Sequence, residues 1–222
     1  MMISKDRILQ KIKEVKSKAK KRRFVQTWDL IVNLKNWDLK KPENRILEYV
    51  ELPHGRGKKV PVAAIVGPEL EKDAKEIFDL VITKDQLPEL GANKRQAKKI
   101  ARRYEFFVAQ ADLMPLVGRY LGKYLGPRDK MPNPKAGMIF PPKVTRKDLE
   151  NLYNKLQKTV RVSVKKHVTF GVPVGSENME DELVAENIEY FINWLLNRLP
   201  MGKQNIDSIY LKLTMSPAVR LI

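Results

Sequence analysis

The order of apolar and polar residues at the start of the chain predicts a helix followed by strands. The helix has one apolar stripe, with steps of four, three and four residues, which consists of Ile8, Ile12, Val15 and Ala19. Ser4 precedes it as a candidate N-cap, and its other faces are rich in lysine. From Phe24 to Leu34 the more apolar residues recur at every second position, which predicts a strand. Residues 46–52 predict a second strand.

The middle of the chain follows a different pattern, in which short continuous apolar runs alternate with helical stretches. The apolar runs and helical stretches alternate over residues 62–66, 68–76, 79–83, 93–103, 104–108 and 112–125. Strands that are buried on both faces have continuous apolar sequences, and helices between them indicate parallel βαβ units. We therefore expect a small doubly wound domain in this part of the chain.

The last third returns to a mixed pattern of strands and one long helix. Strands are predicted at residues 161–164 and 169–172, and a final strand has one apolar face that consists of Ile209, Leu211, Leu213 and Met215. The helix between them has a buried stripe that consists of Val184, Ile188, Phe191, Ile192, Leu195 and Leu196. Since strand-rich segments lie on both sides of the βαβ block, we expect the chain to leave one domain, build a second and return. Two crossings would make the connection a hinge with limited freedom.

The net charge of the chain indicates what kind of partner it binds. The chain has 222 residues, of which 43 are Lys or Arg and 26 are Asp or Glu, so its net charge is +17. A charge of this size favours a polyanion, either a nucleic acid or an anionic membrane face. Residues 1–63 carry a net +10, residues 64–156 carry +6 and residues 157–222 carry +1. The run Lys16–Arg23 fits a solvated helix face or a phosphate-binding surface, and the overall charge favours the second.

Residue types and spacings argue against metal and cofactor chemistry. The chain has no cysteine, and its two histidines, His54 and His167, do not have the spacing of a metal-binding helix, so we expect no metal. The loop Pro53–Lys59 lacks the spacing and the hydroxyl of a phosphate-binding loop, and a single glycine, Gly67, follows the first apolar run. We therefore expect no cofactor. A nucleotide-dependent enzyme that uses the doubly wound block is the alternative.

The acidic residues of the long helix and the lack of long apolar stretches also bear on function. Three acids recur at steps of four and three on the long helix, a spacing more typical of a solvated face than of a catalytic pair: Glu182, Glu186 and Glu189. The sequence contains no secretory signal and no apolar stretch of about 20 residues. We therefore expect no membrane association and a cytoplasmic location.

One loop carries a family resemblance. Residues 125–137 have the sequence Leu-Gly-Pro-Arg-Asp-Lys-Met-Pro-Asn-Pro-Lys-Ala-Gly, a proline-fixed loop with three cations. This loop resembles the signature of the L-one family of large-subunit ribosomal proteins, which belong to the mobile side stalk. Three further segments are similar to that family in the same order, at residues 23–27, 52–58 and 214–220. The resemblance spans nearly the whole chain, and the sequence is more similar to the archaeal branch of the family than to the bacterial one.

The resemblance implies an α/β fold with two domains. The first is an α+β, discontinuous split β-α-β domain that binds RNA, for which we expect residues 1–63 and 157–222. The second is an inserted Rossmann-like domain with three α/β layers, for which we expect residues 64–156.

The resemblance also implies a function without catalysis. Members bind a junction in large-subunit ribosomal RNA (rRNA), assist the release of deacylated transfer RNA (tRNA) from the exit site, and repress translation by binding their own operon messenger RNA (mRNA). We therefore expect these three RNA partners, no enzyme activity, a free monomer, and a place in the cytoplasmic large ribosomal subunit.

The resemblance further implies which residues contact rRNA. Phe24, Thr27, Thr214 and Met215 match family residues with this role, and such groups suit RNA recognition through shape and 2′-hydroxyls. Without the resemblance, Phe24 and Met215 would be expected in the core. The full expected set is Lys21, Arg22, Arg23, Phe24, Thr27, His54, Lys58, Lys165, Lys166, His167, Thr214, Met215, Ser216 and Arg220.

The signature loop has two possible roles. Arg128, Lys130 and Lys135 are expected either to form a secondary RNA contact or to brace the loops of the insert. The family commonly has glycine at the positions of Asp129 and Ser216. The aspartate removes one positive charge from the loop, and the serine would allow close backbone approach to RNA only at negative φ.

Overall fold

The computed structural model describes residues 4–222, which form two units. The first unit combines the chain up to Lys58 with Lys158–Ile222, and the second comprises Lys59–Gln157. The boundary expected between residues 63 and 64 falls inside a strand, and the structure places it after Lys58. The reason is that Val60 already bonds within the insert: its N–H donates to Gln157 Oε1 at 2.8 Å, and Gln157 Nε2 donates to the Val60 carbonyl at 2.8 Å.

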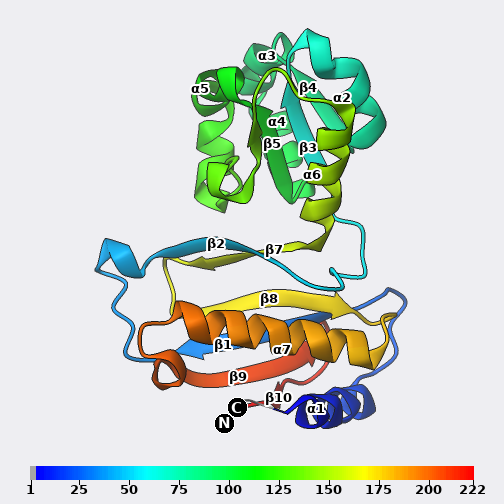
Figure 1. Cartoon of the computed structure of the whole chain (residues 1–222), viewed down its shortest axis with the longest axis vertical. Coiled ribbons are helices and arrows are strands. Elements are labelled where there is room, and N and C mark those ends of the chain that lie inside the picture. Colours follow the sequence, from blue (N-terminus) through cyan, green and yellow to red (C-terminus); the bar gives the residue numbers. More distant parts are fainter. Residues whose placement is uncertain (1–3) are drawn as a thin grey trace. The chain divides into compact units, whose positions relative to one another are not determined.

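The described part of the first unit contains two antiparallel sheets and two α-helices (Figure 1). Its elements are α1 (Lys5–Lys18), β1 (Thr27–Leu34), η1 (Pro42–Asn44), β2 (Ile46–Glu51), β7 (Thr159–Val164), β8 (Thr169–Ser176), α7 (Asp181–Arg198), η6 (Gly202–Asn205), β9 (Ile206–Leu213) and β10 (Val219–Arg220). The larger sheet has the order β10-β9-β1-β8, and β2 pairs with β7. Because β1 is antiparallel to both β8 and β9, these two strands run parallel, with α7 connecting them. This arrangement confirms the predicted split β-α-β fold.

One face of the larger sheet is covered by α1 and α7, which also pack against each other. Side chains alternate along β1, so that Trp28, Leu30, Val32 and Leu34 are buried. They meet Ile8, Ile12 and Val15 of α1 and the predicted stripe of α7 in one core. The two amphipathic helices expected from the sequence are therefore confirmed, and the core fixes which side of β1 faces solvent.

The second unit is a parallel sheet between two layers of helices (Figure 1). Its elements are β3 (Val62–Val66), η2 (Pro68–Leu70), α2 (Glu71–Ile77), β4 (Leu80–Thr83), α3 (Gln86–Ala92), α4 (Lys94–Arg103), β5 (Phe106–Gln110), η3 (Ala111–Leu113), α5 (Met114–Leu125), η4 (Gly126–Arg128), η5 (Pro134–Ala136), β6 (Ile139–Phe140) and α6 (Arg146–Lys158). The strand order is β4-β3-β5-β6, with all neighbours parallel. Helices α3, α4 and α5 share one core with one face of the sheet. Helices α2 and α6 lie on the other side, so the doubly wound, three-layer prediction is confirmed.

Two strands have bounds that differ from the prediction. The strand predicted from Phe24 begins at Thr27, where pairing with Ser176 of β8 begins. The strand predicted to reach Met215 ends at Leu213, because the Ser216 N–H donates to the Leu213 carbonyl at 3.1 Å and closes a turn. Phe24 and Met215 are consequently outside the sheet and outside the core.

Candidate functional site

Large apolar side chains are exposed at the end of the first unit where β1 begins. Phe24, Val25 and Met215 have exposed fractions of 51%, 41% and 53%. Among the described residues, the other large hydrophobic side chains with such exposure are Tyr190 and Met201, on different elements. Exposed apolar groups that gather at one place mark a surface that a partner covers.

Hydrogen bonds between the two chain ends hold these side chains together. The Thr27 N–H donates to Thr214 Oγ1 at 3.0 Å, and the Met215 N–H donates to Gln26 Oε1 at 3.0 Å. We call the group Phe24, Val25, Thr27, Thr214 and Met215 the β1-start surface. Residues almost two hundred positions apart in the chain thereby form one surface with apolar and hydroxyl groups.

Ser216 differs from its neighbours because its side chain is 8% exposed. Its Oγ accepts the Leu213 N–H at 2.9 Å and lies 3.0 Å from the Pro217 carbonyl, to which it donates. Its φ is not positive, since the non-glycine residues with positive φ are Asn36 and Asp129 in the part of the chain that the structure describes. The Ser216 side chain thus holds the turn that presents Thr214 and Met215.

The loop between β2 and the insert reaches the same end of the first unit. Asn187 of α7, which is fully buried, accepts the His54 N–H at 3.1 Å through Oδ1. Its Nδ2 donates to the carbonyls of Gly55 at 2.8 Å and Val174 at 2.9 Å. Lys58 is exposed farther along this loop. Asn187 therefore fixes the path of the loop that contains two of the expected RNA-contact residues.

The His54 side chain contacts a carboxylate of α7 that also forms an ion pair with Lys5. Its Nε2 contacts Glu186, and Lys5 Nζ lies 2.6 Å from the other oxygen of the same carboxylate. Hydrogen bonds from Lys5 and His54 hold the pKa of Glu186 below its ordinary value. Glu186 therefore has a structural role, as expected from a solvated helix face rather than a catalytic acid.

The cations that precede Phe24 divide into paired and exposed groups. Lys16 forms an ion pair with Asp181 at 2.5 Å, and Lys18 forms one with Glu14 at 2.6 Å. Hydrogen bonds from Lys11 and Lys18 hold the pKa of Glu14 at about 2. The cations beyond the helix are exposed and lead directly to Phe24; they are Lys20, Lys21, Arg22 and Arg23. These four cations give the β1-start surface a positive border.

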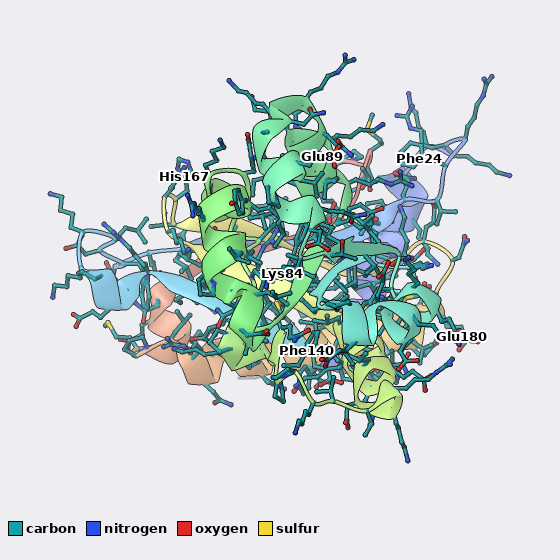
Figure 2. All side chains as sticks on the ribbon, turned by 90° about the horizontal axis from the view of Figure 1, so that it is seen from above. Phe24, Lys84, Glu89, Phe140, His167 and Glu180 are labelled. Atoms are coloured by element: carbon teal, nitrogen blue, oxygen red, sulfur yellow. The ribbon has the colours of Figure 1, made fainter. Side chains whose placement is uncertain are left out.

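Part of the expected site lies elsewhere in the first unit. Thr27 and Asn33 pair with Ser176 and Thr169 at opposite ends of β8, about 20 Å apart at ~3.3 Å per residue. Lys165, Lys166 and His167 precede Thr169 and thus lie at the far end from Phe24, as Figure 2 also shows for Phe24 and His167. Arg220 pairs with Tyr210, opposite the middle of β1. These four residues do not join the β1-start surface.

The signature loop of the insert is held by internal contacts. The Lys130 side chain is 9% exposed, and its Nζ donates to the Tyr104 carbonyl at 2.7 Å and lies 3.7 Å from Glu105. Arg128 Nη1 donates to the Tyr124 carbonyl at 2.9 Å, whereas Lys135 is exposed. Asp129 has a φ of 55°, a left-handed conformation that explains a preference for glycine at this position. These contacts favour the bracing role for Arg128 and Lys130.

In the first βα turn of the insert, the N–H of the single glycine is bonded within the chain. The Gly67 N–H donates to Oε1 of Gln110 at 2.8 Å, and Gln110 is 6% exposed. In a dinucleotide-binding domain the N–H groups of this turn would face a pyrophosphate. The Gln110 side chain occupies that position, which argues against the alternative of a nucleotide-dependent enzyme.

Residues 4–222 contain neither a metal-binding cluster nor a membrane-spanning helix. No three His, Asp or Glu side chains come close enough together there to hold a metal ion. In the same part of the chain, no helix combines the length and the apolar character that crossing a bilayer requires.

Gln26 was not expected as a site residue, although its position is informative. It is 1% exposed, and Glu177 bonds to its backbone N–H at 3.0 Å. Its side chain is therefore held where it accepts the Met215 N–H. Gln26 lies within the motif at residues 23–27, but no local pattern reveals the supporting role of Gln26 or Asn187, because each acts through residues distant in the chain.

We predict that Gln26→Leu loosens the turn at Met215. Loss of the acceptor should reduce the free energy of unfolding by about 1 kcal/mol and accelerate hydrogen exchange of the Met215 amide. The control is Gln204→Leu at an exposed position, which should change stability by less than ~0.5 kcal/mol. An unchanged exchange rate at Met215 would show that Gln26 does not position this turn.

Comparison with known proteins places these features in a wider group. The model of the ribosomal protein L1p/L10e family matches residues 13–217. Three similar proteins carry the name large ribosomal subunit protein uL1. The protein from Nanoarchaeum equitans is 59% identical over 205 residues, which is 92% of this chain and 94% of the relative. Those from Methanothermobacter thermautotrophicus and Thermococcus kodakarensis are 48% and 44% identical over 97% and 100% of this chain, and 98% and 99% of their own lengths.

The fold and the exposed surface define a basic two-unit α/β protein, with a split sheet built from both chain ends and a doubly wound insert. Its relatives are ribosomal proteins rather than enzymes, in agreement with the expectation that the chain is not an enzyme. The chain belongs to the ribosomal protein L1p/L10e family, as its sequence motifs indicated.

Proposed function

We propose that this chain binds a junction in large-subunit rRNA through the β1-start surface of its first unit. The observation that carries the proposal is that hydrogen bonds between the two chain ends join Thr27 to Thr214 and Gln26 to Met215, close in sequence to the exposed Phe24. The names of the relatives support the large ribosomal subunit as the place of action.

The chemistry of this surface suits a compact RNA structure. Met215 and Phe24 offer apolar area against which riboses and bases can pack, and the hydroxyl groups of Thr27 and Thr214 can meet 2′-hydroxyls. Lys20 to Arg23 border the surface and supply attraction to phosphates. We assign specificity to the neutral residues and much of the affinity to the cations.

Binding of exit-site tRNA and of the chain's own operon mRNA forms the second part of the proposal. It rests on the family membership, together with the motif resemblance, which implies action on deacylated tRNA and repression of translation. An mRNA segment that folds like the rRNA junction would be bound by the same surface, because the contacts depend on shape.

The test separates specific from general RNA binding. A footprint on large-subunit rRNA first defines the protected junction, and that fragment is compared with an unrelated RNA duplex. Thr214→Ala and Met215→Ala should each weaken binding to the junction about tenfold and change duplex binding little. Thr214→Ser retains the hydroxyl and should bind nearly as tightly as the original chain.

Lys21→Ala is the matched control for charge. Because a phosphate contact is independent of sequence, this variant should weaken the junction and the duplex by similar factors. Equal losses on both RNAs for the Thr214 and Met215 variants would overturn the assignment of specificity to the β1-start surface.

A further inference from the structure

Helix α4 of the insert presents a solvent face made almost entirely of cations. Its ten residues contain six Lys and Arg and no acid. Ala97 and Ala101 are buried against the unit, which turns the opposite side to solvent. The exposed side chains are Lys94, Arg95, Gln96, Lys98, Lys99, Arg102 and Arg103. Arg103 lies over the ring of Tyr104, at 5.8 Å from its centroid.

These cations repel one another. Four like-charged pairs lie four residues apart: Lys94 with Lys98, Arg95 with Lys99, Lys98 with Arg102, and Lys99 with Arg103. Such pairs destabilise a helix, and Lys94 and Arg95 also stand at the end where the helix dipole disfavours positive charge. An anion bound to this face would therefore stabilise α4.

Acidic side chains of the described residues, 4–222, do not supply that anion. Within residues 4–222, none of the six α4 cations forms an ion pair with an acidic side chain. Helix α1 is different, because Lys11 and Lys18 bond to Glu14, and Lys16 bonds to Asp181. The charge of α4 is thus left for a partner outside the chain.

The spacing of the α4 cations matches a nucleic-acid backbone. Arg95 to Arg102 spans about 10 Å of helix axis at ~1.5 Å per residue. A duplex carries one phosphate charge per ~1.7 Å of axis, or about six over the same length. The four cations from Arg95 to Arg102 are therefore comparable in density to the phosphates that they would face.

The solvent face of α4 has no exposed apolar side chain, which argues for RNA over an acidic protein or an anionic membrane. A protein interface normally has an apolar core, and a membrane-surface helix inserts apolar side chains. The exposed positions of α4 are cationic apart from the Gln96 amide. Contact with a phosphodiester backbone requires only such groups.

We propose that the solvent face of α4 is a second RNA-binding surface, which contacts the phosphate backbone of duplex RNA without regard to sequence. It lies on the insert and is separate from the β1-start surface, so its success or failure is independent of the specificity assigned to Thr214 and Met215.

The test compares two full-length triple variants. The α4 variant carries Lys94→Gln, Lys98→Gln and Lys99→Gln. The control carries Lys72→Gln, Lys84→Gln and Lys143→Gln, three exposed lysines outside α4 in the same unit; Lys84 is labelled in Figure 2. Each variant lowers the net charge from +17 by three. Glutamine has nearly the helix propensity of lysine, so α4 should stay folded.

The measurement is affinity for a random-sequence RNA duplex of about 30 base pairs at several salt concentrations. The α4 variant should bind about tenfold more weakly at ~0.1 M salt, and the slope of log K against log salt should become shallower by about two to three. The control should change the slope by less than about one. Equal slopes for the two variants would overturn the proposal.

A second measurement uses the unaltered chain. Bound duplex should protect Lys94, Lys98 and Lys99 from acetylation more than Lys72 and Lys84, as read by mass spectrometry of peptides. Equal protection of both groups would contradict the proposal. Two other polyanions, poly-glutamate and anionic lipid vesicles, are compared with RNA at equal charge concentration. If either binds the chain as tightly as RNA does, and the α4 variant loses that binding, the proposal is contradicted, since the partner would then be another polyanion.

Discussion

Asn187→Ala should reduce the free energy of unfolding of the first unit by about 3 kcal/mol. The substitution leaves the carbonyls of Gly55 and Val174 and the N–H of His54 without their partner. The Asn187 side chain is fully buried, so water does not readily replace it, and each unsatisfied buried group costs about 1 to 3 kcal/mol. The measurement is urea unfolding followed by tryptophan fluorescence, which reports on the first unit because Trp28, Trp37 and Trp194 all belong to it.

Asn193→Ala is the matched control for this prediction. It removes the same side chain from the same helix at a partly exposed position, and stability should change by less than about 0.5 kcal/mol. The exchange rate of the His54 amide provides a local readout and should rise only in the Asn187 variant. Equal losses in the two variants would show that the bonds to the loop contribute little.

Gly57→Ala should reduce the free energy of unfolding by about 2 kcal/mol. Gly57 has a φ of +61°, where a side chain costs roughly 1 to 2 kcal/mol. A Cβ at this position would also overlap the Met179 side chain and come within 3.1 Å of Ser176 Cβ. The same urea unfolding experiment measures the loss.

The control for Gly57 is Gly171→Ala in β8. A Cβ there would meet nothing within 4 Å, and the φ of Gly171 is not positive. Alanine should therefore leave stability unchanged or raise it by up to about 1 kcal/mol, because it restricts the unfolded chain. A loss at Gly171 as large as that at Gly57 would refute the explanation from local backbone geometry.

Periodicity predicted those elements that depend on neighbours close in sequence. The stripe of α7 and the continuous run of β3 are visible in the sequence because an amphipathic helix and a doubly buried strand each have a local pattern. The start of β1 and the end of β9 were not predicted correctly, since the first is set by pairing with Ser176 and the second by the turn that Ser216 closes. The two-residue strands β6 and β10 are too short for any period to reveal them.

The candidate site was predictable in its exposed residues and not in their supports. Thr214 and Met215 belong to a motif that resembles the family, and the structure joins them to Gln26 and Thr27. Gln26 and Asn187 act through partners more than one hundred residues away in the chain, which no local pattern encodes. Lys165 to His167 were expected at the same site because their charge is visible in the sequence, whereas the length of β8 that separates them from Phe24 is not.

The central position of β1 in the larger sheet has a consequence for synthesis of the chain. β1 pairs with β8 and β9, which follow it by more than one hundred residues, whereas the insert is continuous in sequence. During synthesis from the N-terminus, the insert can fold before β8 and β9, the pairing partners of β1, have been made. Thr214 and Met215 emerge after β9, so nascent chains that stop before them would lack the β1-start surface. The chain would therefore complete its proposed rRNA-binding surface only near the end of its own translation.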